Sequence, residues 1–114
     1  MVQRFIELTR LLEALETIMR RDGLWHHKPP SLEAMNSSMP FAVDTLEFTD
    51  WLQFMFIPRM QTLIDQKMPL PATCIIKPAA EVALMGRTGV DGLMAQLQHI
   101  DDFFARLSSA TDGT

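Results

Sequence analysis

Residues 40–60 read PFAVDTLEFTDWLQFMFIPRM, and this stretch decides the fold because it gathers most of the aromatic side chains of the chain. Its apolar residues recur every three or four positions, which is typical of a helix with one wide buried face. We expect the helix to begin between Thr45 and Thr49. Pro58 falls inside the pattern, and an interior proline cannot donate a backbone hydrogen bond to Phe54. The sequence therefore predicts a long, mostly buried helix that kinks or breaks near Pro58.

Three further helices are predicted around this one. An amphipathic pattern occupies residues 2–22 and ends at Gly23, which can adopt the left-handed conformation that closes a helix. A short helix starts at the proline of residues 78–85 and is closed by Gly86. The last helix starts at residue 90 or 91 and ends at 107. These patterns predict an all-α fold, a small four-helix bundle of up-and-down-like topology whose long second helix is kinked by proline.

An irregular connector is predicted between the first two helices, at residues 24–30, where two adjacent prolines exclude regular helix. Trp25 is expected to tuck back onto the bundle as an anchor. Ser31 is expected to cap a short helical turn that follows the connector. His26 and His27 are adjacent, so their side chains point apart, and no cysteine or second histidine cluster accompanies them. No metal site is predicted there.

Length and composition predict one domain, residues 1–108, followed by a flexible tail at 109–114. Cys74 is the one cysteine, which excludes an internal disulfide, and its apolar neighbours indicate packing. The sequence contains no signal-peptide pattern and no apolar run of the roughly 20 residues that cross a membrane. We expect a soluble protein of the reducing cytoplasm, with no membrane association.

The charge pattern argues against tight nucleic-acid binding. Ten basic and fourteen acidic side chains give a net charge of −4, and the basic ones form no stripe along the sequence. Affinity for a phosphate backbone comes from clustered lysine and arginine, so no direct nucleic-acid partner is expected. Residues 86–89, Gly-Arg-Thr-Gly, match the loop by which KH domains clamp nucleic acid, but no three-stranded sheet is predicted. We interpret these glycines as helix-cap and turn residues.

No residue pattern in the chain predicts catalysis. The serines lack the elbow motif that activates a nucleophile, and His99 has no local arrangement that aims it at a serine or at Cys74. The carboxylates of residues 44–50 complement the start of a helix dipole. We therefore predict no catalytic residues, no cofactor and no metal, and a chain that is not an enzyme.

Six short motifs together resemble a known family. They are Pro40-Phe41, Asp44-Thr45-Leu46, Trp51-Leu52-Gln53, Phe56-Ile57-Pro58-Arg59-Met60, Leu70-Pro71 and Pro78-Ala79-Ala80-Glu81. The chain resembles the YqcC-like family of small gammaproteobacterial proteins over nearly its whole length, and WLQ followed by FIPRM is the most specific part. The resemblance implies an all-helical fold and an unassigned function. Because the family's gene often neighbours that of a tRNA pseudouridine synthase, the resemblance also implies an accessory role and this enzyme as a possible protein partner.

The family pattern singles out five candidate interaction residues whose types apolar packing alone does not demand. They are Trp51, Gln53, Pro58, Arg59 and Glu81. The leading hypothesis is a non-enzymatic binding or adaptor protein that docks a protein partner through a surface around Arg59. Nine methionines support it, because flexible thioethers suit adaptable interfaces as well as irregular cores.

Two other functions remain open from the sequence. A pocket lined by Trp51, Arg59 and Glu81 would bind a small molecule whose anionic group is held by the arginine. Direct tRNA binding would require a basic face that forms only in the folded chain. The environment of Arg59 is also open, since its guanidinium can pair with Asp44 or Glu47 or point to solvent.

Overall fold

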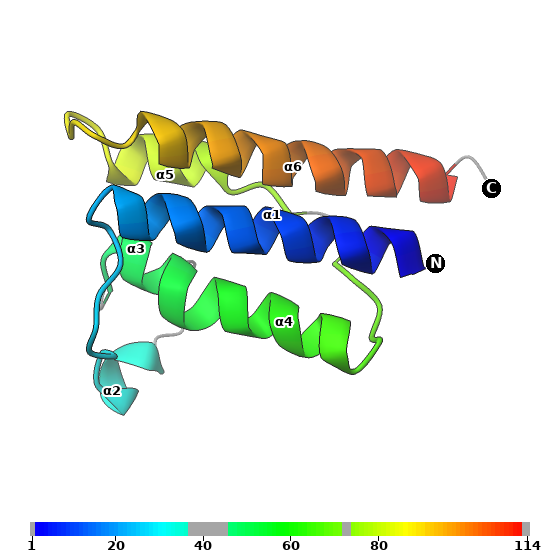
Figure 1. Cartoon of the computed structure of the whole chain (residues 1–114), viewed down its shortest axis with the longest axis horizontal. Helices are drawn as coiled ribbons and strands as arrows, with labels where there is room; N and C mark the ends of the chain where they lie inside the picture. The colour runs from blue at the N-terminus through cyan, green and yellow to red at the C-terminus, as the bar shows by residue number, and fades with distance from the viewer. Residues whose placement is uncertain (1, 37–45, 72–73, 113–114) are drawn as a thin grey trace.

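The computed structural model describes residues 2–36, 46–71 and 74–112, and every regular element in these ranges is a helix. The elements are α1 Val2–Arg21, α2 Leu32–Met35, α3 Phe48–Trp51, η2 Leu52–Phe56, α4 Ile57–Asp65, α5 Lys77–Ala83 and α6 Asp91–Asp112. The prediction of an all-α fold is confirmed. The long elements α1, α3–η2–α4 and α6 run along the molecule, and α1, α3–η2–α4, α5 and α6 alternate in direction (Figure 1).

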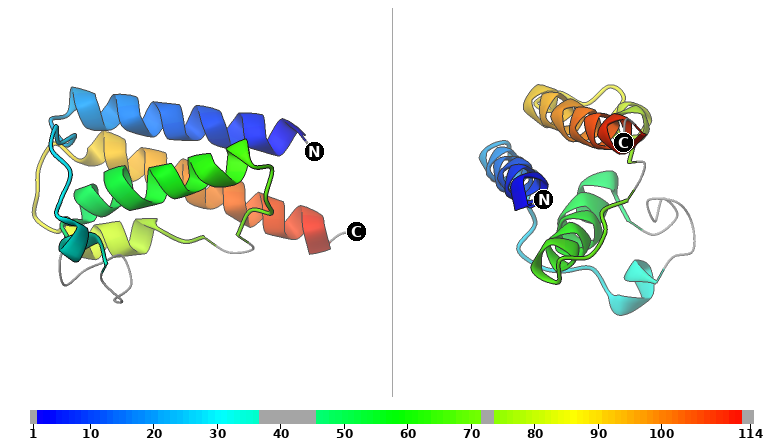
Figure 2. Two further views of the ribbon diagram at one scale, coloured as in Figure 1. Left: turned by 90° about the horizontal axis from the view of Figure 1, so that it is seen from below. Right: turned by 90° about the vertical axis from the view of Figure 1, so that its right-hand side faces the viewer.

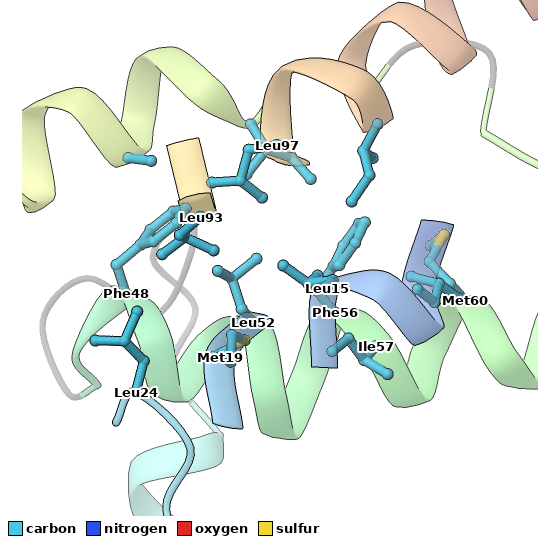
Figure 3. Close-up of a cluster of buried hydrophobic side chains, with 14 of the residues drawn as sticks. Leu15, Met19, Leu24, Phe48, Leu52, Phe56, Ile57, Met60, Leu93 and Leu97 are labelled. Carbon is cyan, nitrogen blue, oxygen red and sulfur yellow. The ribbon is translucent and has the colours of Figure 1, made fainter. Parts of the chain in front are cut away.

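The core lies where the three long elements meet. α1 packs against α6 and against α4, and α5 packs along α6. Leu15 of α1, Leu52 of η2 and Leu93 of α6 are fully buried and point toward one another (Figure 3). The short α2 stands apart, and in the view along the long axis it lies on the opposite side of α3–η2–α4 from α1 (Figure 2). The side of α3–η2–α4 that faces α2 is thus left uncovered by the other long helices.

The end of α1 follows the sequence closely. Gly23 has a φ of 73°, and Leu24 N–H donates to the Met19 carbonyl at 2.8 Å, which closes the helix in the expected way. Trp25 is half-buried against the core, and the Arg20 guanidinium lies 4.6 Å from its ring centroid. Ser31 Oγ accepts from Ala34 N–H at 3.1 Å, so the predicted cap of α2 is confirmed.

The long second helix is interrupted just before its proline. It begins at Phe48, inside the predicted window, but Glu47 occupies the N-cap position and makes no side-chain cap bond. Thr45, one edge of that window, lies outside the described residues. The interruption takes the form of the five-residue π-helix η2, at whose end Ile57 N–H donates to the Leu52 carbonyl. Pro58 follows as the second residue of α4, so the wider π-helical turn lies directly before the position where a proline interrupts the regular hydrogen-bond ladder.

Two polar residues of α6 bond to backbone groups of other segments of the bundle. Gln96 is 7% exposed, and its Nε2 donates to the Leu11 carbonyl of α1 at 2.9 Å. Asp101 accepts from the backbone N–H groups of Ile76 and Lys77, each at 2.8 Å. Helical periodicity cannot indicate either contact, because it does not show which neighbouring backbone offers a partner. The helix also ends later than predicted, at Asp112 instead of Leu107.

Candidate functional site

An apolar groove of about 830 Å³ lies beside α3–η2–α4. One wall comes from this segment, through Trp51, Phe54, Met55, Phe56, Arg59, Met60 and Leu63. The other wall comes from the connection to α5, through Pro69, Pro71, Cys74, Ile75 and Ile76, and Met35 of α2 also lines the groove. We call this feature the Arg59 groove. Its volume is within the range of about 300–1,000 Å³ that is usual for ligand-binding clefts.

A row of residues spaced by four forms much of the helical wall. Trp51, Met55, Arg59 and Leu63 all line the groove. On a regular α-helix with 3.6 residues per turn, such a row rotates by roughly 40° at each step and drifts off one face. A π-helical turn takes in more residues, so η2 offsets part of this drift. The π-helical turn before Pro58 therefore helps to keep Trp51, Met55, Arg59 and Leu63 on the face of the helix that lines the groove.

Trp51, which lines the groove, packs against two other aromatic rings. The Trp51 ring stacks on Phe56, with centroids 5.4 Å apart and an interplanar angle of 29°, and lies 5.8 Å from the ring of Phe48. Phe48 and Phe56 are buried, whereas Trp51 is only half-buried. Aromatic pairs of this geometry add to the stability that burial provides. Trp51 thus presents part of its apolar ring surface to the groove.

Arg59 is the one charged side chain among the described residues that line the groove, and it is exposed. The arginine ion pairs in the described part of the chain involve Arg20, Arg21 and Arg106. Glu47 makes no ion pair with Arg59 there, and Asp44 lies outside the described residues. The groove therefore combines apolar walls with a cation that none of the described carboxylates neutralises.

Cys74 lies half-buried in the second wall. Burial, and to a smaller extent the negative charge of Asp101, raises the pKa of its thiol to about 12. The thiol is therefore protonated near neutral pH, and a protonated thiol is a poor nucleophile and a poor metal ligand. Within residues 2–36, 46–71 and 74–112, no three His, Cys, Asp or Glu side chains cluster in a way that could hold a metal ion.

The structure brings two of the five candidate interaction residues together on the groove, Trp51 and Arg59. Gln53 is 6% exposed and instead bonds to the backbone of His26. Pro58 is exposed beside Arg59, and Glu81 is exposed on α5, but neither lines the groove. Glu81 therefore does not join Trp51 and Arg59 among the described residues that line this groove.

Sequence reasoning missed Met35, Ile75 and the two prolines of the second wall. Nothing in their local pattern indicates a surface, because they come from α2 and from the connection between α4 and α5. The four-residue spacing of Trp51, Met55 and Arg59 was the available signal for the first wall.

The glycines of residues 86–89 have the geometry of cap and turn residues. Gly86 and Gly89 have φ values of 81° and 76°, and they join α5 to α6. No strand occurs in the described ranges, so the sheet that a KH domain requires is not found there. No helix within those ranges is both long enough and apolar enough to cross a membrane.

Comparison with known proteins assigns the chain to a family. Residues 7–103 match the DUF446 family, whose description is "tRNA pseudouridine synthase C". The chain belongs to the DUF446 family. It is similar to the uncharacterized protein YqcC of Escherichia coli K12, with 39% identity over 82% of this chain and 87% of YqcC. An uncharacterized protein of Haemophilus influenzae is 36% identical over 80% of this chain and 86% of its own length.

The solution NMR structure of E. coli YqcC has the same fold, with a TM-score of 0.79 and 36% identity over 90% of this chain and 88% of YqcC. The resemblance to the YqcC-like family is thus confirmed. A third relative is of a different kind. A protein of Pectobacterium carotovorum named tRNA pseudouridine synthase C is 40% identical over 65 residues, which are 54% of this chain but 17% of that much longer protein.

Proposed function

We propose that this chain is a non-enzymatic adaptor that docks on tRNA pseudouridine synthase C and uses the Arg59 groove as its contact surface. The observation that carries the proposal is the Pectobacterium protein, which bears the synthase name and contains a segment similar to this chain. Two modules joined in one polypeptide meet at an effective concentration in the millimolar range. The same contact between the two modules can form between separate chains when its affinity is high enough.

The charge of the chain supports a protein partner over tRNA. Its net charge is −4, whereas affinity for RNA comes from clustered cations. Arg20, Arg21 and Arg106 are already engaged in ion pairs with carboxylates of this chain. An enzyme that binds tRNA must itself present positive charge, and an acidic adaptor would be attracted to it at long range.

The proposed location of the chain is the cytoplasm.

The Arg59 groove supports recognition over catalysis. Its walls are built from methionine, proline and aromatic side chains, which bury apolar surface and adapt in shape. Cys74 is its one thiol among the described lining residues, and the pKa of that thiol is raised to about 12. Such a surface provides contact area and a point charge for orientation.

Purification of both proteins from one organism tests the proposal. We expect a complex with a micromolar or lower dissociation constant by calorimetry, and a change in the rate or tRNA affinity of the synthase when the chain is added at saturation. Bovine serum albumin at the same concentration controls for nonspecific stabilisation of the enzyme. Absence of a complex at tens of micromolar, together with unchanged pseudouridine formation, would refute the proposal.

A second candidate function is the binding of a small anionic molecule at Arg59. The groove volume of about 830 Å³ favours it, because a molecule of metabolite size would fit beside the guanidinium. A thermal-shift screen of anionic metabolites tests this function. A ligand at a hundred times its dissociation constant adds about 2.7 kcal/mol of stability. A hit whose shift disappears in Arg59→Ala would favour it, and a flat screen would remove it.

A further inference from the structure

We propose that the Arg59 groove receives an amphipathic helix of the synthase, and that a carboxylate on this helix pairs with Arg59. This inference rests on the proposed docking function and specifies its surface and the chemistry of the partner segment. Charge complementarity carries it. Arg59 is exposed in an otherwise apolar lining and makes no ion pair within the described residues, so its guanidinium offers a positive charge that a carboxylate of a partner can match.

A carboxylate is required because of what docking does to Arg59. An apolar segment that filled the groove would remove water from the guanidinium, and a charge that is desolvated without a partner opposes binding strongly. Arginine forms paired hydrogen bonds with a carboxylate in a fixed planar geometry, which adds orientation to the contact. A purely apolar helix would therefore bind poorly, whereas a helix with one well-placed aspartate or glutamate would bind in a single register.

A helix fits the groove better than an extended strand does. A strand would need a sheet edge with free backbone groups, and residues 2–36, 46–71 and 74–112 contain no strand. The ends of the row, Trp51 and Leu63, are separated by twelve residue-to-residue steps, which correspond to roughly 18 Å at a rise of about 1.5 Å per residue. A partner helix of about three turns would cover this length. The methionines Met35, Met55 and Met60 can adjust to its side chains.

Two pairs of matched variants test the two halves of the inference by calorimetry with the full-length synthase. Arg59→Glu should weaken binding by about 30-fold or more, the usual effect of losing a central arginine, while Arg87→Glu should change it by less than about twofold. Arg87 is also an exposed arginine, but it lies in the connection before α6 and is not among the described residues that line the groove. Arg59→Lys should retain part of the affinity, because the charge remains and the planar fork is lost.

The apolar half is tested with Ile75→Asp against Val82→Asp. The side chains of Ile75 and Val82 are 62% and 72% exposed, so neither substitution should destabilise the fold. Of the two residues, only Ile75 lines the groove. Ile75→Asp should weaken binding by about tenfold or more, and Val82→Asp by less than about twofold. Thermal unfolding of all variants within a few degrees of the unmodified chain verifies that they are folded.

The outcomes separate this inference from the proposed function. If the unmodified chain forms no complex with the synthase, both are refuted. If a complex forms and neither Arg59→Glu nor Ile75→Asp weakens it, docking stands and the groove assignment is wrong. If Val82→Asp is the disruptive variant, the contact lies on the outer face of α5 instead. Light scattering of the chain alone tests a further outcome. If the chain forms a dimer that Arg59→Glu dissociates, the groove binds a second copy of the chain and the inference is overturned.

Discussion

Gln53 holds His26 through both backbone groups of that residue. Its Oε1 accepts from His26 N–H at 2.8 Å, and its Nε2 donates to the His26 carbonyl at 2.6 Å. His26 Nδ1 in turn lies 2.5 Å from Asp50 Oδ1. These contacts fasten the connector after α1 to the first turns of the long second helix. Gln53, one of the candidate interaction residues of the family pattern, thus holds one segment of the chain against another.

Replacement of Gln53 by leucine should destabilise the fold by about 2–3 kcal/mol. The change keeps the side-chain volume but removes two hydrogen bonds and leaves two partly buried backbone groups without a partner. Urea unfolding measures the effect. Gln61→Leu on the exposed surface of α4 is the matched control, and we expect it to stay within about 0.5 kcal/mol of the unmodified chain. Equal effects of the two changes would contradict this role of Gln53.

Asp101→Ala should loosen α5 and cost about 2 kcal/mol. The carboxylate of Asp101 accepts from the N–H groups of Ile76 and Lys77 at the start of α5, which has no side-chain cap of its own. Hydrogen exchange should show the largest loss of protection in α5. Asp102→Ala removes an exposed carboxylate that bonds only within α6, to Gln98, and serves as the control. Protection of α5 that is unchanged in Asp101→Ala would rule out this cap.

Leu93→Ala should be among the most damaging single truncations, at about 2–5 kcal/mol. Leu93 is fully buried where α6 meets the other long elements, so its truncation loses apolar contact and leaves a cavity (Figure 3). Met85→Ala, at a side chain that is 78% exposed, should change the stability by less than about 0.5 kcal/mol. Calorimetric unfolding of both variants compares the two sites directly. A loss below about 1 kcal/mol for Leu93→Ala would mean that the core is less tightly packed there.

Cys74 should react slowly with alkylating reagents. Its thiol pKa is raised from 9.0 to about 12, so near neutral pH the thiolate fraction is about a thousandfold below that of an unperturbed cysteine. The rate of iodoacetamide labelling, compared between folded and urea-unfolded chain, measures this difference. A folded chain that labels as fast as the unfolded one would contradict burial of the thiol.

The same shift makes stability depend on pH in the alkaline range. The thiol pKa is higher in the folded state, so its contribution is fully present below pH 9 and is lost as the pH rises toward 12. The free energy of unfolding of the unmodified chain should therefore fall across this pH window by more than that of Cys74→Ala. Parallel pH profiles for the two proteins would argue that the thiol titrates normally.

Much of the helical architecture was predictable because helices depend on short-range patterns. Apolar spacing located α1, α4 and α6, and Gly23 and Ser31 act at the helix ends as their chemistry requires. Arg59 and Trp51 were predicted as surface candidates, and both line the groove. The form of the break at Pro58 was not predicted, because the choice between a kink and a π-helical turn depends on which side chains the surrounding core accepts.

The sequence by itself determined the fold class, the main helices and the acidic charge, since each follows from residue types and their local spacing. Only the tertiary structure decided that three polar side chains bond to backbone groups far away in the sequence. The separation is 27 residues for Gln53, 85 residues for Gln96 and 25 residues for the bond of Asp101 to Ile76. The tertiary structure also decided that α2 and the connection before α5 complete a groove around Arg59. Local periodicity specifies which face of a helix is apolar, but long-range packing determines which other segment covers that face and which part of it stays open.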